Sequence, residues 1–594
     1  MDRNTRNSSM TIAKMGALCL VVLIIALGIG VPVAAEITND KFEDITTAAM
    51  PNQTKYGGED LGHDDKVNVN DQITELITLK SASGMPMVFD ETMRDDSHVM
   101  MASNDNDLPS YSIANYKGMV ESDFSADPTI EHSDTTTDSK PSIKDGASVD
   151  VTKFQMAQFA VRPGSGTRRE VREEAKLPSA LKYNYAYGFE MEAIYMDNQD
   201  LNDSLKDESF LLAPTVFGLF TYRPNAWLET TLEMTLEQLI GVKEEDVVQL
   251  PDGTLQPKEK KRLSLLVDQA LVKLKNLGPF EVTVGRQNYE DIRLWLYDAA
   301  LDAFLVKLSL GDVHTFASLS REDLVDGELL YSAGRGKTDN YILYSEYRGI
   351  EDHKLGAYGI KRDDTEGLYE PLHLGVRMVG RPSDRLNYWT DLGMTFGKDE
   401  DNNDLEGYGF DVGATYRFLS IPLQPSITLS YAFGSGDDDP NDKKNHEFRQ
   451  TGLQSNEGRF GGVTQFKYYG EMFDPELTNL KVFTAGLGFR LAAGAFVDIV
   501  YHNYRQDEIT DEFTSSNLTA LINQDNTHLS KDVGNEVDII LGFRNLFGLR
   551  RLGLEFRLGW FFPGDAYRIP EGDPDNPTFR KADQGISALG VIIL

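Results

Sequence analysis

The chain has 594 residues, and its 94 acidic against 58 basic side chains give a formal net charge of −36. This excess of acid argues against a protein that binds nucleic acid through charge. The hydrophobic content of 40% argues against a chain that is disordered throughout, and 51 glycines with 10% aromatic residues suit a large β architecture with many turns.

Residues 1–35 have the pattern of a secretory signal peptide. Basic residues precede the apolar run MGALCLVVLIIALGIGVPV, and Val33-Ala34-Ala35 offers small side chains for cleavage. The alternative is a single membrane anchor, because the run is about long enough to span a bilayer. The only cysteine, Cys19, lies in this run without the preceding small residues that a lipoprotein site needs. A cleaved chain would therefore hold neither a disulfide nor a thiol nucleophile.

Residues 36–182 are predicted to form an acidic extension of low structure that ends in a linker. The part from 36 to 155 has 9 Lys plus Arg and 24 Asp plus Glu, and it is rich in Ser, Thr and Asn with little periodicity. Residues 156–182 change to mixed charge, as in RPGSGTRREVREEAK. The sequence assigns no role to this extension.

From residue 183 onward, apolar and polar side chains alternate with a period of two. The stretch KYNYAYGFEMEAIYM (182–196) shows this pattern, and so does GYGFDVGATYRF (407–418), where Tyr408, Phe410 and Val412 alternate with Gly409 and Asp411. Each alternating segment is about 9 to 12 residues long, the length that a tilted strand needs to cross a membrane. Their spacing predicts an all-β fold over 183–594, a transmembrane antiparallel β-barrel of about 18 strands.

The connections and the polar faces separate this barrel from a soluble β-sandwich or lectin-like fold. Short connections such as RPSDR (381–385) alternate with long polar ones, as periplasmic turns alternate with outer loops. A soluble sandwich would carry Lys, Glu and Ser on a solvated outer face, whereas the polar faces here hold Gly and Thr with isolated Arg and Asp. Aromatic residues also gather at segment ends, as in interfacial girdles. We therefore predict that the protein lies in the outer membrane of a Gram-negative-type cell.

The sequence offers no recognisable catalytic or metal centre, so we predict a protein that is not an enzyme and carries neither cofactor nor metal. His314, His373 and His502 lie in candidate strands, but nothing in the pattern pairs them with a nucleophile. The run Asp437-Asp438-Asp439 offers oxygen ligands without the regular spacing of a calcium loop, and a solvated loop is the simpler interpretation.

Arginines recur on the inward face of the predicted strands. They are Arg348, Arg377, Arg381, Arg417, Arg490, Arg544 and Arg557. One interpretation is structural, because inward carboxylates such as Asp391 and Asp411 could pair with them. The other is that some line a constriction for anions, since guanidinium stays charged and binds carboxylates in two-point contacts. The pattern alone leaves both open.

Six motifs resemble the alginate-export porin family. They are VGRQNYED (284–291), RQTGLQSN (449–456), GEMFDPELTNL (470–480), IVYHNYRQ (499–506), GNEVDIILG (534–542) and FFPGDAYR (561–568). The resemblance implies a single-chain outer-membrane barrel of roughly 18 strands through which an anionic exopolysaccharide diffuses. It also implies contact with outer-membrane lipid, a periplasmic scaffold lipoprotein and an inner-membrane synthesis complex.

Carried over residue by residue, the resemblance makes Arg286, Arg490 and Arg557 the best pore candidates. Glu457 stands where the family pattern favours a basic residue, with Arg459 two positions later, and Glu555 is a second unexpected acid. Arg286 has the same parity as Val284, so it faces the lumen only if a bulge intervenes or the strand ends there. The acidic extension has no counterpart in the family pattern.

The resulting prediction is an outer-membrane porin that exports an anionic exopolysaccharide, alginate or a similar uronate polymer, through an arginine-lined electropositive pore. The alternative is a general or anion-selective porin for small solutes. A surface adhesin or an outer-membrane enzyme is the third class. No nucleic acid partner is expected.

Overall fold

The computed structural model describes residues 183–204, 207–249, 255–330, 338–364, 369–460, 465–492, 494–513, 515–546, 549, 552–573 and 576–594. The predicted signal peptide and acidic extension lie outside these residues. In this part of the chain, no helix has the length and apolar character needed to cross a membrane.

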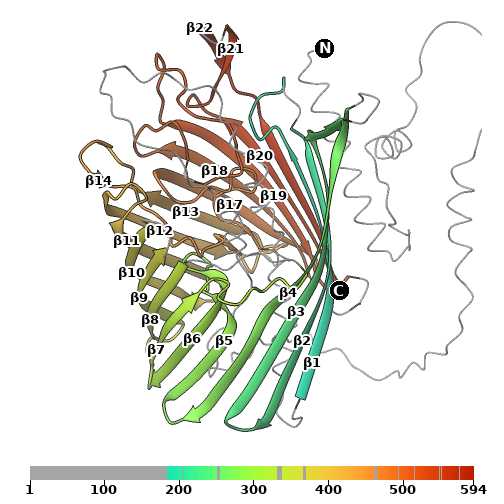
Figure 1. The fold of residues 1–594 in the computed structure, drawn as a ribbon, viewed down its shortest axis with the longest axis vertical. Helices are drawn as coiled ribbons and strands as arrows, with labels where there is room; N and C mark the ends of the chain where they lie inside the picture. The colour runs from blue at the N-terminus through green and yellow to red at the C-terminus, as the bar shows by residue number, and fades with distance from the viewer. Residues whose placement is uncertain are drawn as a thin grey trace, which may run out of the picture. The chain divides into compact units, whose positions relative to one another are not determined.

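Eighteen long strands form one closed antiparallel barrel (Figure 1). The first nine are β1 (Tyr183–Asp197), β2 (Ser209–Asn225), β3 (Leu228–Gln249), β4 (Leu255–Leu277), β5 (Phe280–Glu290), β6 (Asp298–Leu310), β7 (Val313–Arg321), β8 (Thr338–Tyr347) and β9 (His353–Asp364). The other nine are β10 (Glu370–Ser383), β11 (Leu386–Lys398), β12 (Asp404–Arg417), β13 (Ser426–Gly434), β17 (Leu480–Ala492), β18 (Ala495–Gln506), β19 (Asp532–Phe543), β20 (Gly553–Pro563) and β23 (Gly585–Ile593). Each pairs with the next, and β23 pairs with β1, which closes the ring.

Five short strands lie in the connections. β14 (Lys444–Asn445) runs beside β12, β15 (Glu457–Gly458) pairs with β16 (Phe466–Lys467), and β21 (Arg568–Asp573) with β22 (Asn576–Lys581) forms a projecting hairpin, at the top of Figure 1. The long strands are joined by short turns at one end, as from Leu310 to Val313, and by longer loops at the other, as from Gly434 to Leu480. Short turns mark the periplasmic end of such barrels.

The outward face of the barrel is apolar, as the alternation predicts. On β12, Tyr408 is 52% exposed and Tyr416 40% exposed, whereas Asp411 and Thr415 point inward and are buried. Similar outward rows of Leu, Val, Phe and Tyr recur around the sheet. A soluble protein rarely exposes such a continuous apolar surface, and a lipid bilayer is the environment that accepts it. The predicted all-β membrane barrel of about 18 strands is confirmed, and the soluble sandwich is excluded.

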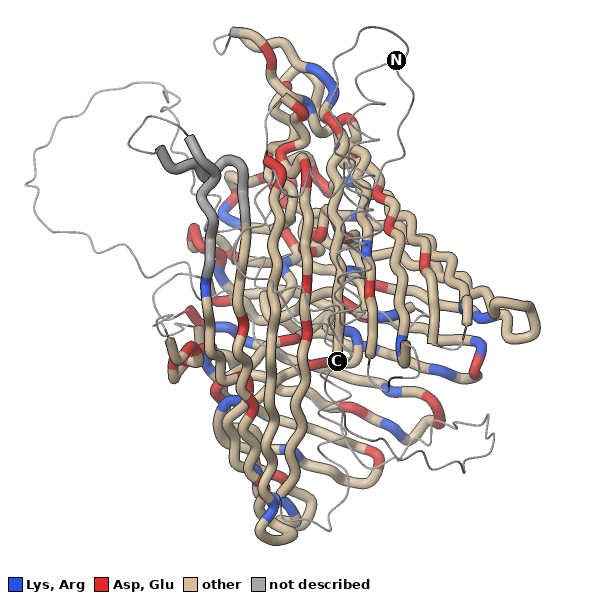
Figure 2. The backbone as a smooth tube through the Cα atoms, turned by 90° about the vertical axis from the view of Figure 1, so that its right-hand side faces the viewer, with Lys and Arg blue, Asp and Glu red and all other residues tan. Residues whose placement is uncertain are grey.

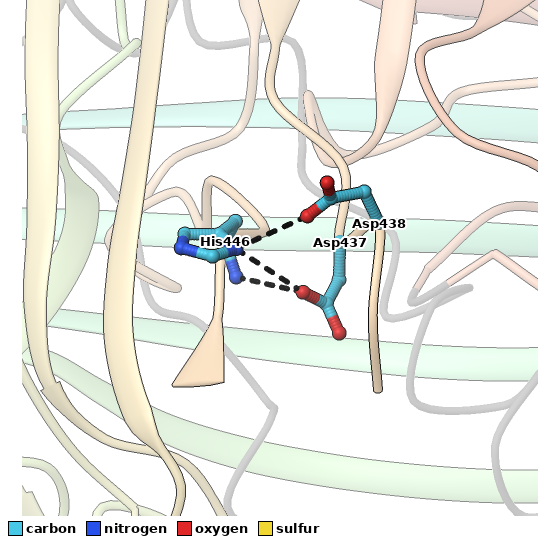
Figure 3. Close-up of side chains that lie close together, drawn as sticks. All are labelled: Asp437, Asp438 and His446. Atoms are coloured by element: carbon cyan, nitrogen blue, oxygen red, sulfur yellow. Dashed lines mark hydrogen bonds and ion pairs between the residues drawn. The ribbon is translucent and has the colours of Figure 1, made fainter. Parts of the chain in front are cut away.

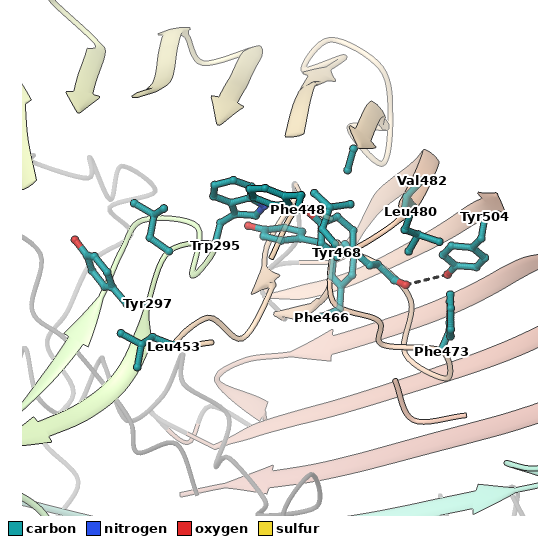
Figure 4. Packing of buried hydrophobic residues seen from close by; sticks show 14 of the residues in the cluster. Trp295, Tyr297, Phe448, Leu453, Phe466, Tyr468, Phe473, Leu480, Val482 and Tyr504 are labelled. Carbon is teal, nitrogen blue, oxygen red and sulfur yellow. Dashed lines mark hydrogen bonds between the residues drawn. The ribbon is translucent and has the colours of Figure 1, made fainter. Parts of the chain in front are cut away.

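Two connections fold into the barrel and bring a hydrophobic core with them. We call residues 291–297, between β5 and β6, the inner loop, and the described residues 448–460 and 465–479, between β13 and β17, the inner arm. Trp295 of the inner loop and Phe448, Phe466 and Phe473 of the inner arm are buried in one cluster with inward side chains of the wall (Figure 4). The lumen is therefore narrowed by packed protein at this level.

Candidate functional site

The inner loop owes its shape to Asp291, which follows β5. The Asp291 carboxylate accepts hydrogen bonds from the backbone N–H groups of Arg293 (2.9 Å), Leu296 (2.6 Å) and Tyr297 (3.2 Å). An aspartate that binds the backbone a few residues ahead replaces ladder hydrogen bonds and makes a tight turn. Leu294 has a φ of +52°, which ends the extended conformation. This turn places Arg293 inside the barrel.

Arg293 is the centre of a buried charge network. Its guanidinium lies 2.7 Å from Asp391 on β11 and 2.9 Å from Asp411 on β12. It also stacks over the rings of Trp389 and Tyr468, at 4.6 Å and 4.7 Å. Burial alone lowers the pKa of Arg293, but Asp411 and Asp391 outweigh it and raise the pKa above its ordinary value. The side chain therefore stays charged and joins the inner loop to the wall.

Arg377 on β10 completes this network. It lies 2.6 Å from Asp291 and 2.7 Å from Asp391, and only 2% of it is exposed. Asp391 is thus shared between Arg293 and Arg377. Arg377 was predicted as a pore residue, and the structure places it inside the barrel in a buried ion pair. It fastens the inner loop and offers no free charge to a passing solute.

The inner arm packs on the same wall through aromatic rings. Phe448 stacks on Trp295 with ring centroids 6.1 Å apart, and Phe460 stacks on Trp389 at 5.7 Å. Phe448 also covers Gly393 and Gly409, where a Cβ would meet its ring. Glycines on an inward face, as in the β12 stretch, predict a wide lumen. This prediction is wrong for Gly409, because Phe448 fills the space that the glycine leaves.

The far end of the inner arm is held by Arg557 on β20. Its guanidinium lies 3.3 Å from Glu457, 3.7 Å from Glu471 and 3.7 Å from Glu555. Arg544, just after β19, approaches Glu555 to 2.5 Å. The unexpected acids Glu457 and Glu555 are thus partners of the predicted pore arginines Arg557 and Arg544.

Burial of Glu471 has a consequence for pH. Burial raises the pKa of Glu471 to about 7, although Arg557 acts in the opposite direction. The carboxyl group accepts a hydrogen bond from the backbone N–H of Lys467 (2.9 Å). The link between the inner arm and Arg557 therefore contains a group that titrates near neutral pH.

The three histidines lie in hydrogen-bonded pairs. His502 on β18 is buried between Thr484 (2.9 Å) and Asp538 (3.1 Å), and His373 contacts Thr395 (3.3 Å). His314 faces Ser309 across the β6–β7 turn at 3.1 Å, as cross-strand neighbours do. These contacts explain the histidines as members of polar networks in the sheet.

A cationic cluster occupies the periplasmic end of the lumen, and we call it the mouth cluster. It consists of Arg381 on β10, Arg417 at the end of β12 and Arg490 on β17, with Arg417 close enough to interact electrostatically with both others. Among the described residues, no carboxylate comes within ion-pair distance of Arg417 or Arg490, but Asp498 on β18 and Asp384 are close enough to Arg417 to interact with it electrostatically. Arg490 stacks over Phe496 at 5.0 Å and contacts Gln424 at 3.3 Å, and Arg381 meets the exposed Asp384 at 3.2 Å.

The remaining predicted arginines lie elsewhere. Arg348, directly after β8, lies 2.6 Å from Glu346. Arg459 is exposed in the inner arm. Arg286 is buried in the wall at the point where β4 and β5 separate, bound to Asp302 and Asp323. The structure thus brings together Arg381, Arg417 and Arg490, places Arg286, Arg348 and Arg377 in separate ion pairs, and joins Arg544 and Arg557 through Glu555.

Acidic residues dominate the charge of the barrel, and Figure 2 shows them along most strands. Among the buried charged side chains that the structure describes, the arginines are Arg286, Arg293, Arg377 and Arg557, and carboxylates make up the large majority. An electropositive lumen along its whole length is not confirmed. Within the mouth cluster, Arg417 and Arg490 have no carboxylate within ion-pair distance in the part of the chain that the structure describes.

The acidic run after β13 forms a small cluster with His446 (Figure 3). His446 Nδ1 lies 3.5 Å from Asp437 and 3.4 Å from Asp438, and its Nε2 lies 3.7 Å from Glu406. Asp438 is largely exposed. The carboxylates thus interact with an imidazole on an outer loop, and this arrangement fits a solvated loop.

Sequence reasoning missed Arg293, the residue with the most contacts in the network. The strand pattern selects inward arginines, and Arg293 lies in a connection. The sequence signal that could have indicated Arg293 is the interruption of the alternation at EDIRLW (290–295). There an Asp precedes an Arg and a Trp in a very short loop.

The closed ring, the apolar outer face and the two ends of unequal loop length define an outer-membrane β-barrel with a polar lumen. The family model for alginate export matches residues 176–579. The chain belongs to the alginate export family.

Individual relatives cover smaller parts. The alginate production protein AlgE of Pseudomonas aeruginosa is 27% identical over 243 residues, 35% of this chain and 46% of that protein. AlgE of Azotobacter vinelandii is 29% identical over 181 residues, 28% of this chain and 36% of that protein. The matches therefore span less than half of each relative.

Solved structures with a similar fold include two other proteins of Pseudomonas aeruginosa. OccK7 (OpdD) is 12% identical with a TM-score of 0.43, and OccK5 (OpdH) is 11% identical with a TM-score of 0.40. Each comparison covers 69% of this chain and 98% of the other chain.

Proposed function

We propose that this protein conducts an anionic polysaccharide, alginate or a similar uronate polymer, outward across the outer membrane, and that it is not an enzyme. The observation that carries the proposal is the mouth cluster, a group of guanidiniums inside the periplasmic end of a barrel of the alginate export family. Within the described part of the chain, Arg417 and Arg490 have no carboxylate within ion-pair distance, so their guanidinium groups can replace the counterions of successive sugar carboxylates.

The arrangement supports weak capture followed by release. Arg417 and Arg490 are partly exposed and near each other, so each contact with a carboxylate remains screened and modest. Deeper in the lumen, Arg377 and Arg557 are already neutralised by acids, so they offer no tight site that would trap the polymer. Conduction needs favourable entry and weak multiple contacts, and this distribution of charge supplies both.

Passage of a polymer requires the inner arm to leave its docked position. The arm holds Phe448 against Gly409 and Phe460 against Trp389, so a sugar chain and the docked arm compete for the same space. We infer that the structure is the closed state and that partner proteins, a periplasmic scaffold lipoprotein and an inner-membrane synthesis complex, act at the mouth.

The docked inner arm is also the observation that favours the alternative, a porin for small anions. With the arm docked, its aromatic side chains occupy the lumen at the level of Trp295 and Phe448. Small anions would be the only solutes to pass if the arm never opens.

Planar-bilayer conductance separates these functions. With Arg381, Arg417 and Arg490 all changed to Glu, we expect loss of anion preference and loss of current block by oligouronates added on the periplasmic side. Lys398→Glu, at the opposite end of β11, is the matched charge control and should leave both unchanged. Oligouronates that never block the wild-type current would refute polymer export, and block that survives the triple change would refute the role of the mouth cluster.

A further inference from the structure

The barrel wall has a seam between β4 and β5. The two strands pair only from Ala270 with Arg286 to Leu277 with Phe280, although β4 begins at Leu255 and β5 continues to Glu290. Beyond Arg286, β4 remains paired with β3, and β5 remains paired with β6. The edge of β4 therefore lacks its strand partner in this part of the wall, where lipid offers no hydrogen bonds.

The connection after β7 closes this seam. We call residues 322–330 the seam loop. The backbone N–H of Val267 donates to Gly327 (2.8 Å), the N–H of Leu329 donates to Leu265 (2.8 Å), and Glu328 accepts from the N–H of Leu265 (3.0 Å). The loop thus supplies the edge of β4 with the partners that β5 does not give.

Arg286 fixes the seam loop to the wall. Its guanidinium donates to Asp302 on β6 (3.1 Å), to Asp323 (2.6 Å) and to the carbonyl of Val325 (2.7 Å), and it also reaches Val267 on β4 (3.3 Å). In the sequence, Arg286 has the same parity as the outward Val284, and the contacts with the seam loop explain this position. The residue lies under the seam loop, where its charge is covered.

An open pocket of about 980 Å³ lies between the seam loop and the outer face. Its lining includes exposed apolar side chains of the strands and of the loop. They are Val284, Phe304, Leu319, Tyr341, Leu324 and Leu329. Leu319 is six residues beyond Val313, so the pocket lies roughly 15 Å above the periplasmic turns, inside the apolar band of about 25 Å. The lining continues the lipid-facing surface.

We propose that this pocket holds an acyl chain of an outer-membrane lipid. The chain would fill a cavity that faces hydrocarbon and cannot stay dry and empty at this size, and it would cover the exposed Leu324 and Leu329 of the seam loop. The ion pair of Arg321 with Asp339 (2.6 Å), partly exposed beside the pocket, gives the polar end of the lipid hydrogen-bonding groups.

Native mass spectrometry of the purified barrel with added dipalmitoyl phosphatidylglycerol tests this site. We expect the wild type to retain one lipid after detergent exchange. Leu319→Trp fills the pocket, so occupancy should fall roughly tenfold, as expected when about two methylene groups lose their contacts. Leu343→Trp, an outward position on β8 outside the pocket lining, is the matched control and should behave as the wild type.

Three results would overturn the proposal. The wild type could retain no lipid, or Leu319→Trp could retain as much as Leu343→Trp. Glycerol phosphate, which has no chain, could also be retained as well as the lipid, and the site would then recognise a headgroup. Heat-dependent gel mobility of both variants reports whether the barrel is folded.

Discussion

Replacing Arg293 by alanine tests whether the inner loop closes the lumen. Arg293 is bound to Asp391, which is fully buried, and to Asp411, which is nearly so. Removing one partner of a buried ion pair costs about 3–5 kcal/mol, because the remaining charge is left without compensation. Contacts with Trp389 and Tyr468 are lost as well.

This cost applies to the docked state of the inner loop and inner arm, because Asp391 and Asp411 regain water when the segments leave. The ratio of docked to undocked states should fall by a factor of about a hundred to a few thousand. In single-channel recordings, Arg293→Ala should therefore show long open intervals at a conductance that the wild type reaches only briefly.

Arg293→Lys keeps the charge without the planar two-point contact, so it should give an intermediate open time. Arg580→Ala, on the outer hairpin, removes partly exposed ion pairs with Asp583 (2.7 Å) and Glu571 (2.8 Å) and should leave gating unchanged. Closed intervals of wild-type length in a folded Arg293→Ala barrel would refute the closing role of this network.

Three further predictions concern the inner arm. The pKa of Glu471 in the docked state is about 7, against an ordinary 4.5, so docking should be strongest below pH 4.5 and should weaken by about 3 kcal/mol as the pH rises to 7. The open probability should rise over the same pH window, and Glu471→Gln should flatten this pH profile. Gly409→Val should raise the open probability, because the new side chain meets Phe448. Gly218→Val, at a position with open space, is the control. Equal recordings from the two variants would contradict the packing of Phe448 against Gly409. Glu457→Gln should increase anion preference, because Arg557 loses part of its compensation, as reversal potentials in a salt gradient can show.

The alternation of side chains predicted the barrel well because a membrane barrel repeats one rule on every strand. An outward residue such as Tyr408 must suit lipid, and an inward residue such as Asp411 must suit water or a polar partner. The number of strands and the unequal loop lengths follow from the same rule. Parity also indicated that Arg286 does not simply face the lumen, and the seam explains why.

The candidate site was harder to predict, because its contacts join residues far apart in the sequence. Asp391 is 98 residues from Arg293, and Arg557 is 100 residues from Glu457. Parity says that each side chain points inward, but it carries no information on which loop enters the lumen to meet it. The arginines of the mouth cluster were found by parity, whereas the absence of a carboxylate within ion-pair distance of Arg417 and Arg490, among the described residues, depends on the three-dimensional arrangement.

The distribution of arginine partners explains how an acidic barrel could still conduct a polyanion. Free carboxylates along the lumen would repel a uronate chain, so inward acids are harmless only where arginines neutralise them, as Arg377 does for Asp391 and Arg557 for Glu555. Because these arginines already neutralise acids of the wall, the attraction that the proposed function requires for the polymer must come from residues outside such pairs. For the proposed export, Arg417 and Arg490 are the candidates, because they have no carboxylate of the described residues within ion-pair distance and lie at the periplasmic end. We therefore propose that the two interpretations are complementary: the deep arginines offset part of the inward acid, and Arg417 and Arg490 at the mouth remain available to the polymer.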